Sequence, residues 1–192
     1  VNWSVFSTSS IIGVVNPSAN VAATIFEAQK TGTGRIIANH ASAIDDSSGV
    51  ITITDGAEYS VKILFNTAGE TGEVNTLSLT TGATQDVHAA SFDRDDNYIQ
   101  DVSANWSVTG NIGTLSQNTG VTTRFTALTK NTGQITATRA GLLSDATGTI
   151  SVTEGTLAKV RIVEGSSGDG TRFTGRNVST DGSFTLHAAG YD

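Results

Sequence analysis

The sequence predicts an all-β protein built of tandem antiparallel β-sandwiches, one complete and two partial. Three observations predict this fold. Apolar and polar residues alternate with a period of two in several short segments, which is typical of strands with one buried face. Turn sequences rich in Gly, Asn and Asp separate these segments. Finally, several segments recur at a constant distance along the chain, which indicates repeated structural units.

Four segments recur 99 residues further along the chain. The pairs are "TGRIIAN" (33–39) with "TGQITAT" (132–138), "GVITITDG" (49–56) with "GTISVTEG" (148–155), "VKI" (61–63) with "VRI" (160–162), and "DVHAASFD" (86–93) with "TLHAAGYD" (185–192). A fifth pair, "NWSV" at 2–5 and at 105–108, lies 103 residues apart, so a loop between the segments changes length. Agreement over separate segments at one offset indicates a true repeat.

The repeat divides the chain unevenly into three segments. Residues 56–154 form one complete repeat. Residues 1–55 match only its later half, and residues 155–192 match only its earlier half. We therefore expect the C-terminal half of one sandwich, then a whole sandwich, and then the N-terminal half of a third.

The expected strands of the complete repeat follow one another at short intervals. They are "YSVKILF" (59–65), "NWSV" (105–108), "TTRFTAL" (122–128), "QITAT" (134–138) and "TISVT" (149–153). In the first of them Val61 and Ile63 lie on one face, and Lys62 and Leu64 on the other. About seven short strands per 100 residues favour a sandwich of immunoglobulin-like topology, with Trp106 in its centre and Trp3 in the matching partial repeat.

Several of these motifs resemble the bacterial immunoglobulin-like domains. The resemblance rests on "LHAAGYD", "DDNYIQDVSANWSVTG", "IGTLS", "TGQITAT" and "TGTISVTEG", and it spans the whole chain in register. Such domains occur in tandem in adhesins of the invasin and intimin type, in S-layer proteins and in other cell-surface proteins. The resemblance implies an extracellular location at the cell surface and a spacer or scaffold role. Family members often carry a D-x-x-G-N turn before the Trp strand, whereas this chain has Asp96 in place of that Gly.

The best candidate for a binding site is the acidic segment "DRDDNYIQD". It contains five oxygen-bearing residues that could converge on one cation: Asp93, Asp95, Asp96, Asn97 and Asp101. Ca²⁺ prefers six to eight oxygen ligands, and acidic loops commonly supply them. The segment is not an EF-hand, because it lacks the central Gly and the terminal Glu. A solvated acidic hairpin is the alternative interpretation of the same residues.

No other motif indicates a site. His88 and His187 occupy equivalent positions of the repeat, which favours a structural role in a strand. The segments "IDDSSG" (44–49) and "GSSGDG" (165–170) are expected to be surface loops, since the second has no Walker Lys and no following helix. We find no nucleophile elbow around any Ser. The sequence therefore predicts no enzymatic activity and no required cofactor.

The composition narrows the classes of partner. The chain has a formal charge of −7, which argues against binding nucleic acid or an anionic membrane. It has no Cys, so neither a disulfide framework nor a Cys-ligated metal is available. No apolar run approaches the length that spans a membrane.

The two partial repeats would each leave apolar side chains without an opposing sheet. Those side chains are Trp3, Val5, Ile36 and Ile53 in residues 1–55, and Val160, Ile162, Phe184 and Leu186 in residues 155–192. Three arrangements would cover them: neighbouring repeats of a longer tandem array, copies of the chain that complement one another head to tail, or a permuted sandwich within one chain.

The resulting functional hypothesis is a structural segment of an extracellular bacterial surface, S-layer or filament-forming protein. The alternative is an adhesin module that binds a glycan or a host protein through sandwich loops, with Phe92, Tyr98 and Phe173 as candidate aromatic contacts. A spacer within a secreted multidomain enzyme is a third possibility.

Overall fold

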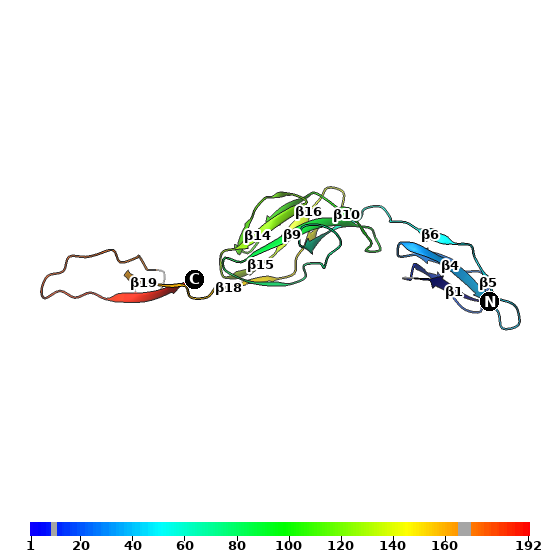
Figure 1. The fold of residues 1–192 in the computed structure, drawn as a ribbon, viewed down its shortest axis with the longest axis horizontal. Helices are drawn as coiled ribbons and strands as arrows, with labels where there is room; N and C mark the ends of the chain where they lie inside the picture. The colour runs from blue at the N-terminus through cyan, green and yellow to red at the C-terminus, as the bar shows by residue number, and fades with distance from the viewer. Residues whose placement is uncertain (9–10, 165–169) are drawn as a thin grey trace.

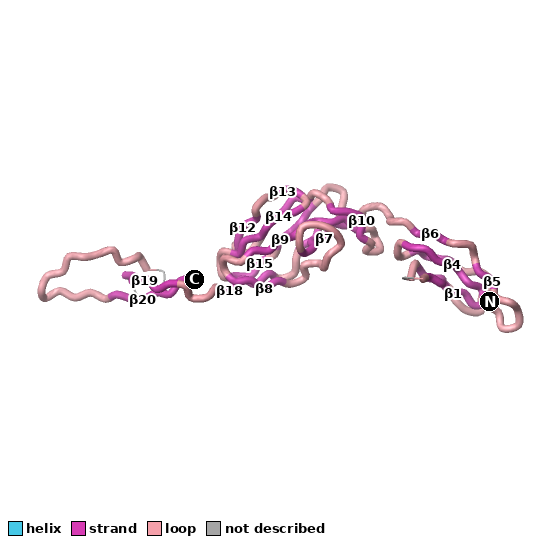
Figure 2. Tube along the Cα trace, in the orientation of Figure 1, coloured by secondary structure: helices cyan, strands magenta, loops and turns pink. Residues whose placement is uncertain are grey.

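Residues 1–8, 11–164 and 170–192 are described by the computed structural model of the chain. Three groups of strands follow one another along an elongated molecule (Figure 1). The complete sandwich lies in the middle, and a smaller set of strands lies at each end (Figure 2). Every regular element among the described residues is a β-strand, so the predicted fold class is confirmed: all-β, with one complete antiparallel sandwich and two partial ones. The domain boundaries at residues 55 and 154 stay a prediction, although no strand crosses either of them.

Twelve strands make up the central sandwich. They are β7 (Ser60–Phe65), β8 (Leu77–Thr80), β9 (Thr84–Phe92), β10 (Tyr98–Asp101), β11 (Ala104–Val108), β12 (Gly113–Leu115), β13 (Thr119–Gly120), β14 (Thr122–Ala127), β15 (Asn131–Gly133), β16 (Ile135–Thr138), β17 (Asp145–Ala146) and β18 (Ile150–Thr153). In one layer, β9 pairs with β7, β10 and β14, and β14 pairs with β12. The other layer contains β13-β11-β16-β17 and β15-β18-β8, and β15 runs into β16. β8 lies parallel to β18.

The core of the central sandwich lies between these two layers. Its fully buried side chains alternate along the strands, as the period-two pattern predicts. They are Val61, Ile63, Val74, Val87, Ala89, Val102, Ala104, Trp106, Ile112, Phe125, Ala127, Ile135, Ala137, Ile150 and Val152. Trp106 lies among them, and its indole Nε1 donates to the carbonyl oxygen of Gly120 at 2.8 Å. This hydrogen bond satisfies the one polar atom that the ring buries.

One face of β7 differs from the expectation. Leu64 lies with Lys62 on the face opposite Val61 and Ile63, which a half-buried strand would leave exposed, but it is fully buried. It packs against Ala90, Phe92 and Tyr98 in a small second cluster outside the main core. These three partners lie on β9 and β10, which belong to the same sheet as β7. The local alternation could not indicate this packing, because the two strands are distant from β7 in sequence.

The N-terminal part repeats the later half of the central sandwich. Its strands are β1 (Asn2–Ser7), β2 (Gly13–Asn16), β3 (Ile25–Ala28), β4 (Gly32–Asn39), β5 (Asp46–Ser47) and β6 (Ile51–Ile53). The register is the same in both: Trp3 pairs with Ala38 in the N-terminal part, as Trp106 pairs with Ala137 in the central sandwich. The Trp3 indole donates to Val21, whose counterpart is Gly120.

The short strand β5 corrects the expectation that residues 44–49 form only a surface loop. Asp46 pairs with Ala38 in β4, in the same register as Asp145 with Ala137. Of the second expected loop (165–170), residues 165–169 lie outside the described residues.

The C-terminal part is a hairpin that repeats the first layer of the central sandwich. It consists of β19 (Lys159–Glu164) and β20 (Leu186–Tyr191). Ile162 pairs with Ala188, as Ile63 pairs with Ala89 in the pairing of β7 with β9. Because a slip of one residue would move every side chain to the opposite face, the shared register places equivalent side chains on equivalent faces.

Candidate functional site: open sheet faces and an acidic junction

The N-terminal part presents an incompletely covered apolar face. Phe26, Ile36 and Ile51 are counterparts of Phe125, Ile135 and Ile150, which are all 0% exposed in the central sandwich. In the N-terminal part the same positions are only half-buried. The strands that would cover them correspond to β7, β8 and β9, and the N-terminal part contains none of these.

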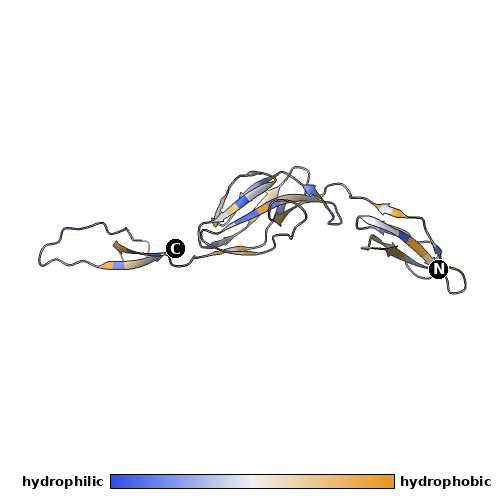
Figure 3. Cartoon of the chain, in the orientation of Figure 1, coloured by the Kyte–Doolittle hydropathy of each residue, from blue (hydrophilic) through white to orange (hydrophobic). Residues whose placement is uncertain are grey.

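The C-terminal hairpin presents the matching face. Val160 is 63% exposed and Ile162 is 54% exposed, whereas their counterparts Val61 and Ile63 are 1% and 0% exposed. Figure 3 shows apolar residues along strands of both terminal parts, and several of these residues are exposed. An uncovered apolar sheet face of this kind marks a site of association or of aggregation.

The face of the hairpin opposite Val160 and Ile162 is better covered. Val163 is fully buried and Ala189 nearly so, as are their counterparts Leu64 and Ala90. Arg161 lies over the ring of Tyr191, at 5.0 Å from the ring centroid, and Lys62 lies over Phe92 in the same way at 4.9 Å. Only the face that corresponds to the sandwich core is thus left without cover.

The edges of these sheets are also unpaired. In the central sandwich β14 pairs with β9 along five residues. Their counterparts, β3 and β20, each have a single strand partner within the described residues, β2 for β3 and β19 for β20. An edge strand offers a row of N–H and C=O groups to any strand that can lie beside it.

The acidic segment forms a tight hydrogen-bonded loop around Asp93. This residue is 5% exposed, and its Oδ1 accepts from the backbone N of Asp95 and of Asn97, both at 2.9 Å. Its Oδ2 accepts from the backbone N of Gly56 at 3.1 Å and from Asn97 Nδ2 at 2.9 Å. Burial by itself would raise the pKa of Asp93, but the hydrogen bonds from Asn97, Gly56 and Asp95 lower it below the ordinary value.

The other predicted metal ligands have partners of their own. Asp96 Oδ1 lies 3.2 Å from Lys62 Nζ, and Asp101 accepts from the backbone N of Gly69 at 3.1 and 3.0 Å and from the hydroxyl of Tyr98 at 3.1 Å. Asp95 is exposed. Throughout the described part of the chain, no group of three or more His, Cys, Asp or Glu residues is placed so that it could hold a metal ion. Calcium binding at this loop stays a prediction.

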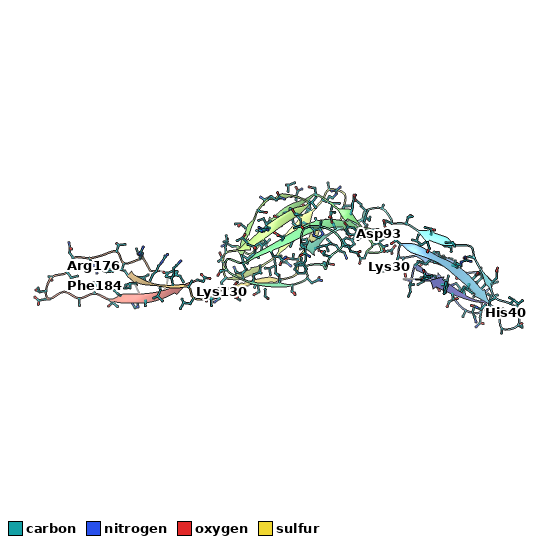
Figure 4. All side chains as sticks on the ribbon, in the orientation of Figure 1. Lys30, His40, Asp93, Lys130, Arg176 and Phe184 are labelled. Atoms are coloured by element: carbon teal, nitrogen blue, oxygen red, sulfur yellow. The ribbon has the colours of Figure 1, made fainter. Side chains whose placement is uncertain are left out.

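The Asp93 contact belongs to the junction between the N-terminal part and the central sandwich. Gly56 lies in the connection between β6 and β7, and Asn97 Nδ2 donates to the carbonyl oxygen of Gln29 at 3.0 Å. Asp93 and Lys30 both lie at this boundary (Figure 4). An open cavity of 570 Å³ beside it is lined by Ile11, Val14, Gln29, Lys30 and Asp95.

The second junction repeats this contact. Asp192 Oδ2 accepts from the backbone N of Gly155 at 2.8 Å and from the Thr81 hydroxyl, and Asp192 and Gly155 are the counterparts of Asp93 and Gly56. A Cβ on Gly56 would lie 3.2 Å from Oδ2 of Asp93, and one on Gly155 would lie 3.0 Å from Oδ2 of Asp192. Glycine thus allows the carboxylate to approach the connection closely at both junctions.

His88 lies inside the sandwich rather than at either junction. Its Nε2 donates to the carbonyl oxygen of Gly69 at 2.8 Å and lies 3.4 Å from Oδ1 of Asp101. This contact anchors the loop that follows β7 over the sheet. Its counterpart, His187, is half-buried in β20.

The aromatic residues considered for an adhesive surface pack against other aromatic rings. Phe92 is buried and makes an edge contact with Tyr98, with ring centroids 5.8 Å apart. Phe173 stacks on Phe184 at 5.4 Å, and the guanidinium of Arg176 lies 5.5 Å from the centroid of the Phe184 ring (Figure 4). The described residues contain no helix that is long and apolar enough to cross a membrane.

Comparisons with known proteins add little. No protein-family model matches the chain, and no curated protein sequence matches it. A solved structure described as surface layer protein SbsC, domains 4–9, aligns with the whole chain at 13% identity and a TM-score of 0.28. The alignment covers 28% of that protein's chain. A likeness at this level carries no argument about function, so the resemblance to bacterial immunoglobulin-like domains stays a prediction.

Two contacts were not predicted from the sequence. One is the hydrogen bond of Asp192 to the second connection, and the other is the hydrogen bond of Asp145 between the two layers. Asp145 Oδ2 accepts from the backbone N of Ile63 at 2.7 Å, between strands 82 residues apart. The constant offset of 99 residues could have indicated Asp192, since it pairs the two Asp residues and the two Gly residues. No sequence signal could have indicated the contact of Asp145, because it depends on how the two layers meet.

Proposed function

We propose that this chain is a structural segment of an extracellular bacterial surface, S-layer or filament-forming protein. In this proposal it consists of immunoglobulin-like sandwiches in tandem, and neighbouring repeats or subunits complete its two terminal halves. It supplies length and stiffness, performs no catalysis and requires no cofactor.

One observation carries the proposal: both terminal parts keep the strand register of the central sandwich while leaving the core-facing side chains open. Trp3 pairs with Ala38, and Ile162 with Ala188, in the register of their counterparts. A sheet face that is built for a core but lacks its opposing layer is most simply explained by a neighbour that provides it.

The connections between the parts favour stiffness. Six residues separate the end of β6 at Ile53 from the start of β7 at Ser60. The backbone of Gly56 in this connection is held by Asp93, and the backbone of Tyr59 donates to Phe92 at 2.8 Å. The second connection repeats both contacts through Asp192 and Tyr191. Short connections that are hydrogen-bonded to a sandwich restrict bending.

Surface labelling tests the proposal. Antibodies raised against residues 1–192 should label intact, unpermeabilised cells of the source bacterium, and proteinase added outside the cells should remove the label. A cytoplasmic control protein should stay unlabelled and protected in the same cells. Label that appears only after permeabilisation would contradict a surface role.

A further inference from the structure

We propose that the C-terminal hairpin of one copy of this chain seats on the open face of the N-terminal part of a second copy. It does so in the register that β7 and β9 adopt within the central sandwich. This inference rests on the proposed function, because it names the neighbour that completes the two ends.

The central sandwich provides the template for the contact between the two copies, which we call the joint. There β9 lies beside β14, with Asp86 opposite Arg124 and Val87 opposite Thr123. The offset of 99 residues translates these pairs into Thr185 opposite Ile25 and Leu186 opposite Thr24. The free edge of β20 therefore meets the free edge of β3, and both edges gain an antiparallel partner.

The side chains that face each other across the joint are apolar on both sides. Val160, Ile162 and Leu186 take the places of Val61, Ile63 and Val87 in the core. The face that receives them contains Trp3, Phe26 and Ile36, the counterparts of Trp106, Phe125 and Ile135. Burial of these groups from water drives the association.

A carboxylate of the receiving face is also matched to a backbone donor of the hairpin. Asp145 accepts from the backbone N of Ala146 in its own turn and from the backbone N of Ile63 across the layers, the latter at 2.7 Å. Its counterpart Asp46 already uses Oδ1 to accept from the backbone N of Ser47 at 2.9 Å. In the joint, Oδ2 of Asp46 receives the backbone N–H of Ile162.

Two backbone hydrogen bonds follow from the same template. Val61 N donates to the carbonyl oxygen of Leu143, and Ala89 N donates to that of Val121, both at 2.9 Å. The corresponding bonds in the joint run from Val160 N to Ile44 and from Ala188 N to Ala22. Ile44 is 99% exposed in the free chain, so its backbone is accessible.

The placement of the two faces favours a second copy over closure within one chain. The N-terminal part and the hairpin lie at opposite ends of the molecule, with the central sandwich between them (Figure 1). Closure within one chain would require both connections to fold back along that sandwich, against the contacts that hold Gly56 and Gly155.

Charge disfavours the pairing of two N-terminal parts with each other. Residues 1–55 contain two basic and four acidic residues, a net charge of −2, whereas residues 155–192 contain four of each and are neutral. Two like-charged faces repel, and a neutral hairpin does not add to the repulsion.

Complementary variants test the joint. Ile162→Asp blocks the hairpin face, and Ile36→Asp blocks the receiving face. Sedimentation velocity over a concentration series should show growing chains for the unmodified protein and monomers for each variant alone. An equimolar mixture of the two variants should form dimers and nothing larger, because only one pair of intact faces remains.

Leu157→Asp is the matched control. Leu157 is 66% exposed, but its counterpart Glu58 lies outside the core, where it accepts from Ser91. This variant should associate like the unmodified protein. A monomeric unmodified protein at all concentrations, or self-association of the Ile162→Asp variant alone, would overturn the proposal.

Cross-linking tests the register without disturbing either core face. The chain has no Cys, so Ile25→Cys in one copy and Thr185→Cys in another supply the only thiols. Their counterparts Arg124 and Asp86 are in contact at 2.6 Å. This pair should form an intermolecular disulfide about tenfold faster than Ile25→Cys with Ser183→Cys, which lies two residues out of register. Equal rates would contradict the register. A cross-link within one chain when both substitutions are combined would contradict pairing between two copies.

The outcomes separate this inference from the proposed function. If the cells carry the protein on their surface but residues 1–192 neither associate nor cross-link, the inference fails and the surface role stands. If the chains associate in register while antibodies fail to label intact cells, the joint stands and the surface role fails.

Discussion

At the residue scale, Asp93 connects the acidic loop to the junction. Its carboxylate accepts hydrogen bonds from Asp95, Asn97 and Gly56, so one side chain holds both the turn and the connection between two parts of the molecule. An ionised acceptor that satisfies several backbone donors is worth more than a neutral one.

The pH dependence of stability should reveal this role. The pKa of Asp93 is lowered in the folded state, so its stabilisation is complete above the ordinary pKa of Asp, about 3.9, and is lost as the pH falls through the folded pKa. We expect Asp93→Asn to lower the free energy of unfolding by about 2 kcal/mol at pH 7. The gap between the two proteins should close towards pH 2, as measured by urea unfolding. Asp95→Asn, at an exposed position, should change little, and a gap independent of pH would contradict the role of the charge.

The conformation of Asp96 explains its place in the turn. Its φ is 62°, in the left-handed region that glycine adopts without strain and that β-branched residues avoid. We expect Asp96→Val to be less stable than Asp96→Gly by about 1–2 kcal/mol, as measured by thermal and urea unfolding. Both variants lose the ion pair with Lys62, so their difference reports the backbone alone. Equal stability of the two would contradict the left-handed turn.

Chelation separates calcium binding from hydrogen bonding at the acidic loop. A bound ion stabilises only the folded state, so the calcium prediction expects the melting temperature to fall in excess chelator and to recover with added Ca²⁺. Asp93→Asn should abolish that response if Asp93 is a ligand. An unchanged melting curve in chelator would assign the order of the loop to the hydrogen bonds of Asp93 alone.

At the element scale, equivalent strands differ in what covers them. β9 lies between β7 on one side and β10 and β14 on the other, whereas β20 has only β19. Strands with open edges and uncovered faces open locally at low free-energy cost, even when their own hairpin is well paired.

Hydrogen exchange should follow this difference in cover. In dilute solution, amides in residues 186–191 should exchange faster than those in 87–92, because Ala188 N lacks the acceptor that Val121 provides to Ala89 N. Amides in β3 should likewise exchange faster than those in β14. Mass spectrometry of peptides should show both differences shrink as the protein concentration rises and joints form. Equal protection at low concentration would show that the terminal strands are already covered.

At the scale of the whole molecule, the three parts lie in a row and are connected by short segments (Figure 2). Each connection contains a glycine whose backbone N donates to the carboxylate of an Asp, so the same contact recurs at both junctions. Repetition of one type of junction along a chain produces a rod whose length grows with the number of units.

Small-angle scattering should show this elongation. A compact protein of this length would have a radius of gyration of roughly 16 Å. The Ile162→Asp variant, which should remain monomeric, should give a distinctly larger value and a pair-distance distribution with a long tail. A radius near the compact value would mean that the ends fold back on the central sandwich.

Sequence alone was enough for the fold class and the repeat, because side-chain alternation and turn residues act locally and the offset of 99 residues can be read directly from the sequence. It also identified apolar residues of the two terminal parts that are not fully buried, Trp3 and Ile162 among them. Tertiary structure decided the rest. It buried Leu64 against Ala90, Phe92 and Tyr98, which are remote in sequence, and it brought the carboxylate of Asp93 to the backbone of Gly56. It also brought Asp145 to the backbone of Ile63 across the two layers. These contacts join segments that are distant along the chain, and only the packing of one sheet on another brings such segments together.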